Sequence, residues 1–209
     1  GGLMNAAEVS RSGGIAHSTL RRYLTLLEVV FVLQPLPAWS ANLGKRLVKS
    51  PKIHLLDSGL TAHLRGETDA GALARSAALG PLLETFVVQE VRKQLGWSRT
   101  SARAYHFRTA AGREVDLVLE GPAQYVAGIE VKAAAGVDAR DFDGLRALAE
   151  AAGRKFASGT LLYLGEHALP GSVTLGIDPA TQRAAAAALA GRSGAVIVLD
   201  PRTGEILAS

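Results

Sequence analysis

Cysteine is absent from the 209-residue sequence. Its absence excludes disulfide bonds and zinc–thiolate sites and is compatible with the cytoplasm. Long apolar runs are missing as well, since Glu28 interrupts the run over residues 24–33. No run approaches the ~20 residues that cross a bilayer, and residues 1–14 lack the basic start and apolar core of a signal peptide. We therefore expect a soluble, cytoplasmic protein with no membrane partner.

Two catalytic motifs are also missing. No G-x-x-x-x-G-K-[ST] phosphate-binding loop occurs, because residues 43–46 lack the leading glycine and the hydroxyl, so we expect no ATP site. No Ser-x-x-Lys motif occurs, which excludes transpeptidation of the penicillin-binding type. The histidines lack metal-ligand spacing, and surface or capping roles are expected for all five. They are His17, His54, His63, His106 and His167.

The composition is otherwise that of a globular protein of one or two domains, with 48% hydrophobic and 20% charged residues. The net charge of +4 is unevenly placed. Residues 1–60 hold seven Lys/Arg and three Asp/Glu, whereas residues 61–209 hold sixteen of each. The basic excess therefore belongs to the N-terminal part, which favours contact with a polyanion there.

Residues 1–72 have the pattern of a winged-helix domain. Residues 5–27 read as a helix-turn-helix, in which Gly13 and Gly14 break the first helix and Ser18 caps the second. The second helix has an apolar seam and presents Arg21 and Arg22 outward. Its apolar residues are Leu20, Tyr23, Leu24 and Leu27. A β-rich stretch at residues 29–33 and a basic loop at residues 45–52 complete the layout.

A winged helix of this kind predicts DNA contact, with helix residues in a groove and loop residues on phosphates. The groove residues would be Ser18, Thr19, Arg21 and Arg22, and the phosphate contacts Lys45, Arg46, Lys49 and Lys52. Winged helices also serve as protein–protein modules, and the sequence leaves that alternative open.

A second domain is predicted at residues 76–169, after a connector at residues 61–77. Gly80-Pro81 begins a helix that runs through Leu95 and ends at Gly96. Glu84 lies beside the apolar stripe of this helix, where a carboxylate is uncommon unless something pairs with it or uses it. A salt bridge to a neighbouring arginine is the alternative.

Residues 105–133 predict three antiparallel strands, the first two joined by a hairpin loop with Gly112. In the second strand, alternation places Val115, Leu117 and Leu119 on one face and Asp116 on the other. In the third strand, Glu130 and Lys132 share the face opposite to that of the apolar residues. The sequence thus predicts two carboxylates and an ammonium on one sheet face, suited to a divalent metal and a phosphate. A solvated Glu130–Lys132 pair worth at most ~1 kcal/mol is the alternative.

The remaining sequence predicts an amphipathic helix at residues 138–156 and a buried strand at residues 159–164. The second domain is thus an α/β unit with the order αβββαβ. Residues 171–209 form a tail with a helix at 178–190 and strands at 195–199 and 205–208.

The set Glu84, Asp116, Glu130 and Lys132 resembles the PD-(D/E)xK restriction-endonuclease-like fold. More closely, residues 1–169 resemble the C-terminal half of a prokaryotic AAA+ ATPase family, in which a winged helix and a nuclease-like domain of unknown function follow the ATPase module. The likeness is carried by the segments STLRRYLTLLE, WSANLGKRLVKSPKIHLLDSGL, GPLLETFVVQEVRKQLGW, REVDLVLE, IEVKA and LLYLGE. The ATPase module itself is absent from this sequence.

The resemblance implies a Mg²⁺ site formed by Asp116, Glu130 and the carbonyl of Val131, because Mg²⁺ prefers oxygen ligands. The metal would activate water for attack on a DNA phosphodiester, and Lys132 would orient that water or share the developing charge. Glu84 would hold a second metal or a metal-bound water. Binding without cleavage is the alternative, since fold does not settle function.

Residues 173–209 resemble a penicillin-binding-protein segment, which suggests a gene fusion, a truncated reading frame or an artificial chain. Three hypotheses follow. The first is a DNA-associated, nuclease-like module with possible Mg²⁺-dependent phosphodiesterase activity. The second is a non-catalytic DNA- or protein-binding regulatory domain of an ATPase-family protein, and the third is an inactive gene fragment.

Overall fold

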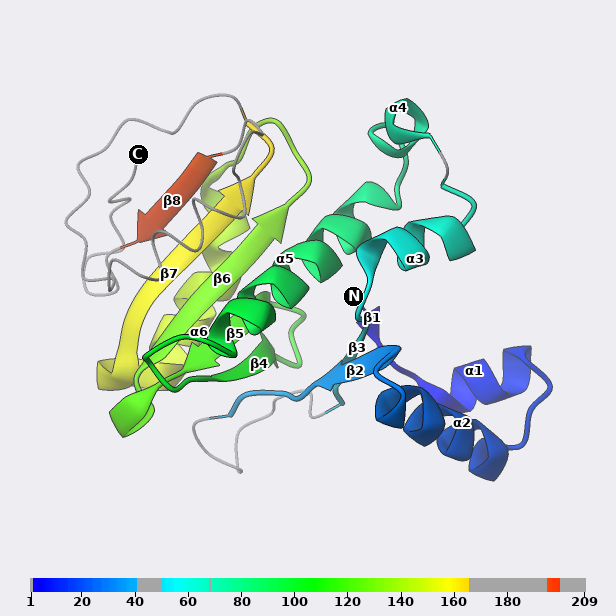
Figure 1. Cartoon of the computed structure of the whole chain (residues 1–209). Helices are drawn as coiled ribbons and strands as arrows, with labels where there is room; N and C mark the ends of the chain where they lie inside the picture. Colours follow the sequence, from blue (N-terminus) through cyan, green and yellow to red (C-terminus); the bar gives the residue numbers. More distant parts are fainter. Residues whose placement is uncertain (1, 41–49, 68, 166–194, 200–209) are drawn as a thin grey trace.

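A computed structural model describes residues 2–40, 50–67 and 69–165 and the strand at 195–199. It is a mixed α/β structure with two sheets (Figure 1), as the sequence predicts at this level. No helix in the described part of the chain is long and apolar enough to cross a membrane.

The first sheet is three-stranded and antiparallel, in the order β1-β3-β2. Two helices precede β2 in the sequence, so the predicted order of two helices followed by strands is present. The bounds are β1 Gly2–Leu3, α1 Ala6–Ser12, α2 His17–Val29, β2 Leu33–Leu36 and β3 Lys52–Leu55. Residues 41–49 lie outside the described residues.

Two local expectations for this region are wrong. Ser18 does not cap α2, because the helix begins at His17 and Ala16 occupies the cap position without a side-chain bond. The expected strand at residues 29–33 is instead the end of α2 and a turn. There Phe31 has φ 57°, and its N–H and that of Val32 bond back to the carbonyls of Glu28 and Leu27. This is the usual way in which a helix satisfies its last carbonyls, although glycine normally occupies the left-handed position.

The connector expected at residues 61–77 contains helical turns. Helix α3 spans Ser58–Leu64 and α4 spans Ala70–Leu73. Each begins at an aspartate, Asp57 or Asp69, whose carboxylate accepts a backbone N–H of the first turn. These capping bonds stabilise short helices that have little apolar periodicity of their own.

We call residues 2–55, which contain the first sheet, the first unit, and the part from residue 79 onward the second unit. The second unit has the predicted order helix, three strands, helix, strand, and a further strand follows. Its main elements are α5 Leu79–Leu95, β4 Arg103–Arg108, β5 Glu114–Glu120, β6 Val126–Lys132, α6 Asp143–Ala152, β7 Phe156–Tyr163 and β8 Ala195–Leu199. Three short 3₁₀ helices lie between them, at Pro122–Gln124, Ala139–Phe142 and Gly153–Lys155.

The five-stranded sheet has the order β4-β5-β6-β7-β8, and all neighbours are antiparallel except the parallel pair β6–β7. The parallel pair requires the crossover that α6 provides. Strand β8 pairs with β7, so part of the predicted tail completes the sheet of the second unit. The predicted helix at 178–190 and strand at 205–208 lie outside the described residues.

A bulge in β5 breaks the alternation that the sequence predicts. Tyr105 pairs with Val118 and Phe107 with Val115, so two residues of β5, Asp116 and Leu117, lie opposite the single residue His106. A bulge re-aims the side chains at the extra residue. Val115 therefore belongs to a different apolar cluster from Leu117, and the expected common face of Val115, Leu117 and Leu119 is wrong.

The core lies on both faces of this sheet. One cluster joins the sheet to α6 through Leu145 and Leu148, and the other joins it to α5 through Val88. Helix α6 approaches closely because β6 carries Gly128, where a Cβ atom would lie 2.7 Å from Leu148 and 2.8 Å from Leu145. Figure 1 shows α5 and α6 on opposite sides of the sheet.

The two units are not joined only by the connector. Leu36 packs with Val88 and Leu117, and Trp39 belongs to the cluster on the α6 side. The indole N–H of Trp39 also donates a hydrogen bond to the carboxylate of Glu120 at 2.7 Å. The segment after β2 therefore belongs to the core of the second unit, and the relative placement of the units is determined by burial.

Candidate functional site

Asp116 lies at the point where β5 and β6 separate. The paired residues of the two strands end at Leu117 and Ile129. Beyond them, the Asp116 carboxylate accepts the backbone N–H of Val131 at 3.0 Å and the ammonium of Lys52 at 2.8 Å. The bulge in β5 places the carboxylate in this position, and only 5% of the residue is exposed. Asp116 therefore has partners at both oxygens.

Lys52 also binds Glu84, at 2.9 Å. It comes from β3 of the first sheet, Glu84 comes from the first half of α5, and Asp116 comes from β5, so one ammonium joins three elements. Burial alone would lower the pKa of Lys52, but the charges of Asp116 and Glu84 outweigh burial and raise it. Lys52 is therefore a buried cation, 3% exposed, held between two carboxylates.

Glu130 and Lys132 form a second ion-paired group. Their side chains are 3.0 Å apart, and Lys132 lies 3.8 Å from Asp141, just before α6. Glu130 is 4% exposed, and its Oε2 atom has no hydrogen-bond partner among the described residues. Burial, followed by the charge of Asp116, raises the pKa of Glu130 to about 8. If this carboxyl is protonated, the positive charges of Lys52 and Lys132 are balanced by the negative charges of Glu84 and Asp116.

We call these two groups together the acidic cluster, comprising Lys52, Glu84, Asp116, Glu130 and Lys132. The structure brings all four residues of the predicted catalytic set into it. It does not gather them on one face, however. Glu84 comes from α5, whereas Lys132 reaches Asp141 beside α6. The Asp116–Val131 hydrogen bond links the two groups.

A buried histidine borders the acidic cluster. His54 Nδ1 lies 3.2 Å from the hydroxyl of Thr85, and Nε2 lies 4.0 Å from Glu84. Burial, together with nearby positive charge that includes Lys52, lowers the pKa of His54 to about 3, so the ring is neutral. His106 is also fully buried and contacts the carbonyl of Ser50. Surface or capping roles for His54 and His106 are therefore wrong, because both lie inside the contact between the two units.

The oxygen set fits a divalent cation only in part. Asp116 and Glu130 contribute carboxylates, and the partnerless Oε2 of Glu130 is available to a cation or a proton. Against this, the ammonium of Lys52 already lies against Asp116 and Glu84. Among the described residues, no three His, Asp or Glu side chains are placed to share one metal ion. Asp116, Glu130 and the Val131 carbonyl could hold Mg²⁺ only after Lys52 moved away.

The predicted DNA-binding residues have different surroundings. Ser18, Arg21 and Arg22 are exposed on α2, and Thr19 is half-buried. Lys52 is buried in the acidic cluster and offers no ammonium to a phosphate at the surface. Lys45, Arg46 and Lys49 lie outside the described residues.

Sequence reasoning missed Lys52 as an internal partner of the acids. It placed Lys52 at the end of a basic loop, whereas the residue begins a strand in which Lys52 and His54 alternate with Ile53 and Leu55. Both polar residues are buried, at 3% and 1% exposed. The alternation was a usable signal, because a strand with both faces covered must provide partners for its polar residues.

Comparison with known proteins gives two family matches. Residues 1–71 match a domain of unknown function, DUF8612, and residues 79–177 match another, DUF4143. Uncharacterized proteins of Mycobacterium tuberculosis and Mycobacterium bovis are each 35% identical to this chain over 182 residues. The match covers 87% of this chain and 39% of each relative, so the chain spans about two fifths of their length. No solved structure matches it significantly. The chain thus contains a segment similar to DUF8612 followed by one similar to DUF4143. Most of its length aligns with part of two longer mycobacterial proteins.

Proposed function

We propose that this chain is the C-terminal recognition module of an AAA+ ATPase-family protein, and that it binds DNA without cutting it. In this proposal the first unit is a winged helix and the second is a PD-(D/E)xK-like domain whose acidic cluster has a structural role. The order of elements and the DUF4143 match support this reading. The longer relatives leave room for an ATPase module outside the aligned part.

The position of Lys52 carries the proposal. Its ammonium lies 2.8 Å from Asp116 and 2.9 Å from Glu84, where a nuclease of this type would need a divalent cation. A metal and an ammonium would repel each other at the same carboxylates. Removing one partner of a buried pair costs ~3–5 kcal/mol, so displacement of Lys52 would have to be driven by another large interaction.

DNA contact is assigned to α2. Its N-terminal half exposes Ser18, Arg21 and Arg22, and residues 1–60 carry the whole basic excess of the chain. Lys52 is buried, so among the predicted DNA-binding residues that the structure describes, Arg21 and Arg22 are the cations that can reach phosphates. Phosphate contacts of this kind make binding strongly dependent on salt concentration.

A Mg²⁺-dependent phosphodiesterase is the second candidate. The partnerless Oε2 of Glu130 favours it, because a buried carboxylate oxygen without a partner is a place for a cation. A bound metal would supply Lewis-acid activation of water and neutralise phosphate charge. Asp116 and Glu130 would hold the metal, and Lys132, which is one-third exposed, would face the developing negative charge.

One experiment separates the two candidates. Supercoiled plasmid is incubated with Mg²⁺ or Mn²⁺ and the wild type, Asp116→Asn, Lys52→Met or the double variant, while DNA affinity is measured by fluorescence anisotropy. The proposal predicts no nicking by the wild type, and DNA binding that is indifferent to chelator and to Asp116→Asn. Metal-dependent nicking that Asp116→Asn abolishes would instead establish the phosphodiesterase. Nicking gained only by Lys52→Met would show that the lysine blocks a latent site.

DNA binding itself is tested by salt. Affinity that falls steeply between 50 and 200 mM salt supports phosphate contact. A flat response, or no binding at low salt, would overturn the DNA assignment and favour a protein partner for the first unit.

A further inference from the structure

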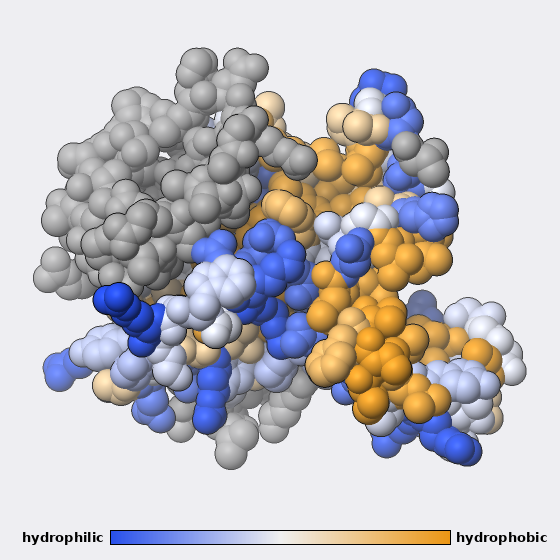
Figure 2. Space-filling view, viewed as in Figure 1, coloured by the Kyte–Doolittle hydropathy of each residue, from blue (hydrophilic) through white to orange (hydrophobic). Residues whose placement is uncertain are grey.

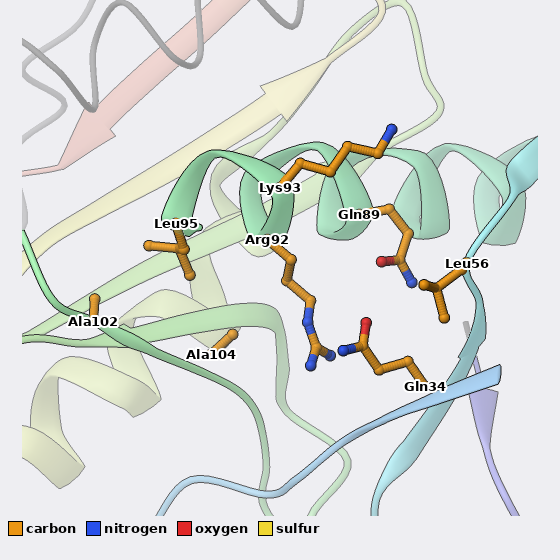
Figure 3. Close-up of a pocket in the computed structure, with 8 residues that line it drawn as sticks. All are labelled: Gln34, Leu56, Gln89, Arg92, Lys93, Leu95, Ala102 and Ala104. Atoms are coloured by element: carbon orange, nitrogen blue, oxygen red, sulfur yellow. The ribbon is translucent and has the colours of Figure 1, made fainter. Parts of the chain in front are cut away.

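A cavity of about 380 Å³ lies between the first sheet and α5, apart from the acidic cluster. It lies between Gln34 of β2 and the C-terminal half of α5, and residues before and within β4 complete its wall (Figure 3). Its polar lining includes Gln34, Gln89 and Arg92, and its apolar lining includes Leu56 and Leu95. A volume of this size suits a small molecule.

Arg92 is the charged group directed into this cavity. Figure 3 shows its side chain extending from α5 toward Gln34. Its guanidinium donates to the carbonyl of Pro35 at 3.3 Å, and no carboxylate of the described residues lies within ion-pair distance. Burial lowers the pKa of Arg92, as it does for a guanidinium that is partly removed from water. A guanidinium has five N–H donors, so most of its hydrogen-bonding capacity is available to a ligand.

Two amide side chains stand beside the guanidinium. Gln89 is 5% exposed and donates to the carbonyl of Leu55 at 3.3 Å, which fixes its orientation. The Gln34 amide faces Arg92 in Figure 3 and makes no hydrogen bond to another described residue. Gln34 can therefore add a neutral N–H donor next to the guanidinium.

Lys93 provides an internal comparison. It follows Arg92 in the sequence and borders the same cavity, but its side chain points away from it in Figure 3. Its ammonium pairs with Glu90 at 2.5 Å and is largely exposed. Only Arg92 of these two neighbours brings its charge into the cavity.

We infer that this cavity binds a small organic oxyanion, a phosphate or a carboxylate, attached to a compact apolar body. The guanidinium of Arg92 would bind the anionic oxygens in pairs, and Gln34 would add a hydrogen bond. Leu56 and Leu95 would contact the apolar part. Since β2 and α5 belong to different units, such a ligand contacts both. The inference does not depend on DNA binding or on catalysis by the acidic cluster.

The test uses the whole chain with ¹⁵N-labelled arginine and follows the Arg92 side-chain Nε–H resonance by NMR. The probes are inorganic phosphate, phenyl phosphate and benzoate, with sodium chloride at matched ionic strength as the control. We expect saturable shifts of the Arg92 resonance with phenyl phosphate or benzoate, and affinity roughly tenfold higher for phenyl phosphate than for inorganic phosphate, because the ring buries apolar surface. The preferred aromatic probe identifies the anion as a phosphate or a carboxylate.

Variants distinguish a built site from general surface charge. Measured by isothermal titration calorimetry with phenyl phosphate, which needs no Arg92 resonance, Arg92→Gln should weaken binding by roughly 10- to 100-fold, the range of a charge-assisted bidentate contact, whereas Lys93→Gln should change it less than about twofold. Gln34→Leu keeps the guanidinium in place and should weaken binding several-fold. It replaces Arg92→Gln as the test variant if Arg92→Gln does not fold. Equal losses in Arg92→Gln and Lys93→Gln, or shifts reproduced by chloride alone, would overturn the inference.

Discussion

The first unit uses its positive charge in two contrasting ways on its two sides. On the side of β3, Lys52 is 3% exposed and is neutralised by Glu84 and Asp116. On the side of α2, Arg21 and Arg22 are exposed. Within the basic segment of residues 1–60, Lys52 thus stabilises the interior, whereas Arg21 and Arg22 are available to a partner. The number of cations in a sequence therefore overestimates the charge that a polyanion can reach.

Apolar residues show the same contrast. Leu36 is completely buried against the second unit, whereas an apolar patch at the end of α2 faces outward. Figure 2 shows apolar surface over the region of α2 and β2. The patch consists of Tyr23, Leu26, Leu27, Val29, Val30 and Phe31, which are 37–77% exposed. The predicted seam is thus confirmed at Leu20 but wrong at Tyr23 and Leu27, because no described element covers that end of the helix.

The largest expected effect tests the buried side. Asp116→Ala should lower the free energy of unfolding by about 3–5 kcal/mol, because it leaves Lys52 with one partner and the N–H of Val131 without an acceptor. Urea unfolding followed by circular dichroism measures the change. The exposed aspartate Asp138, which pairs with Arg140 and caps a short 3₁₀ helix at the surface, supplies the control, since Asp138→Ala should cost clearly less than Asp116→Ala. Similar losses in both variants would contradict the contrast.

The second prediction concerns pH. Because the pKa of Glu130 is raised from 4.5 to about 8, the folded state binds more protons than the unfolded state between these values. Stability should therefore fall as pH rises from 4.5 to 8, by at most about 1.4 kcal/mol per pH unit. His54, with a pKa lowered to about 3, acts in the opposite direction, but only below about 6.5.

The window from pH 6.5 to 8 therefore reports mainly on Glu130, with Glu84, whose pKa burial and Asp116 also raise, acting in the same direction. There Glu130→Gln, which resembles the protonated acid, should remove most of the decline, and its stability relative to the wild type should grow by up to about 2 kcal/mol. Urea unfolding at half-unit steps of pH measures both curves. A wild-type curve that is flat or rises across this window would show that Glu130 remains ionised beside Lys132.

The third prediction addresses the exposed side. Arg21→Gln and Arg22→Gln should each weaken DNA binding by about three- to tenfold and reduce the slope of log affinity against log salt by about one, while leaving stability within about 0.5 kcal/mol. Fluorescence anisotropy over a salt series measures both quantities. The matched control is Arg154→Gln, an exposed arginine next to α6 that should leave both unchanged. Equal loss in the control would mean that binding reflects net charge alone.

The smallest effect is expected at Phe31. Phe31→Gly should raise the free energy of unfolding by about 0.5–1 kcal/mol, because glycine relieves the left-handed backbone at φ 57° and little packing is lost from a side chain that is 77% exposed. Thermal unfolding of the variant measures it. A clear loss of stability would show that Phe31 packs against the protein and that the patch is not an outward surface.

Local patterns predicted much of the second unit. Helix α5 extends from Leu79 to Leu95 because an apolar stripe runs between Pro81 near its start and Gly96 just after its end. Strands β4 and β5 are joined at Gly112, which has φ 86° and so adopts the conformation that a tight hairpin requires. These features depend on residues close in sequence, so local patterns predict them.

The candidate site was predicted only as a set of residues. Asp116, Glu130 and Lys132 come together, but the bulge opposite His106 directs Asp116 toward Lys52 and Glu84. The register between β5 and β4 decides where the extra residue of the bulge lies, and a single sequence does not determine that register. For the same reason, alternation assigned Val115 to the wrong face.

Periodicity, capping residues and turn glycines in the sequence account for the order of helices and strands, because each acts over a few neighbouring residues. The fate of the charges depended on contacts between residues far apart in the chain. Lys52 lies 32 residues from Glu84 and 64 from Asp116, yet its ammonium touches both. Whether such a cation faces water or a carboxylate follows from how the two units pack, since burial without a partner is too costly to persist.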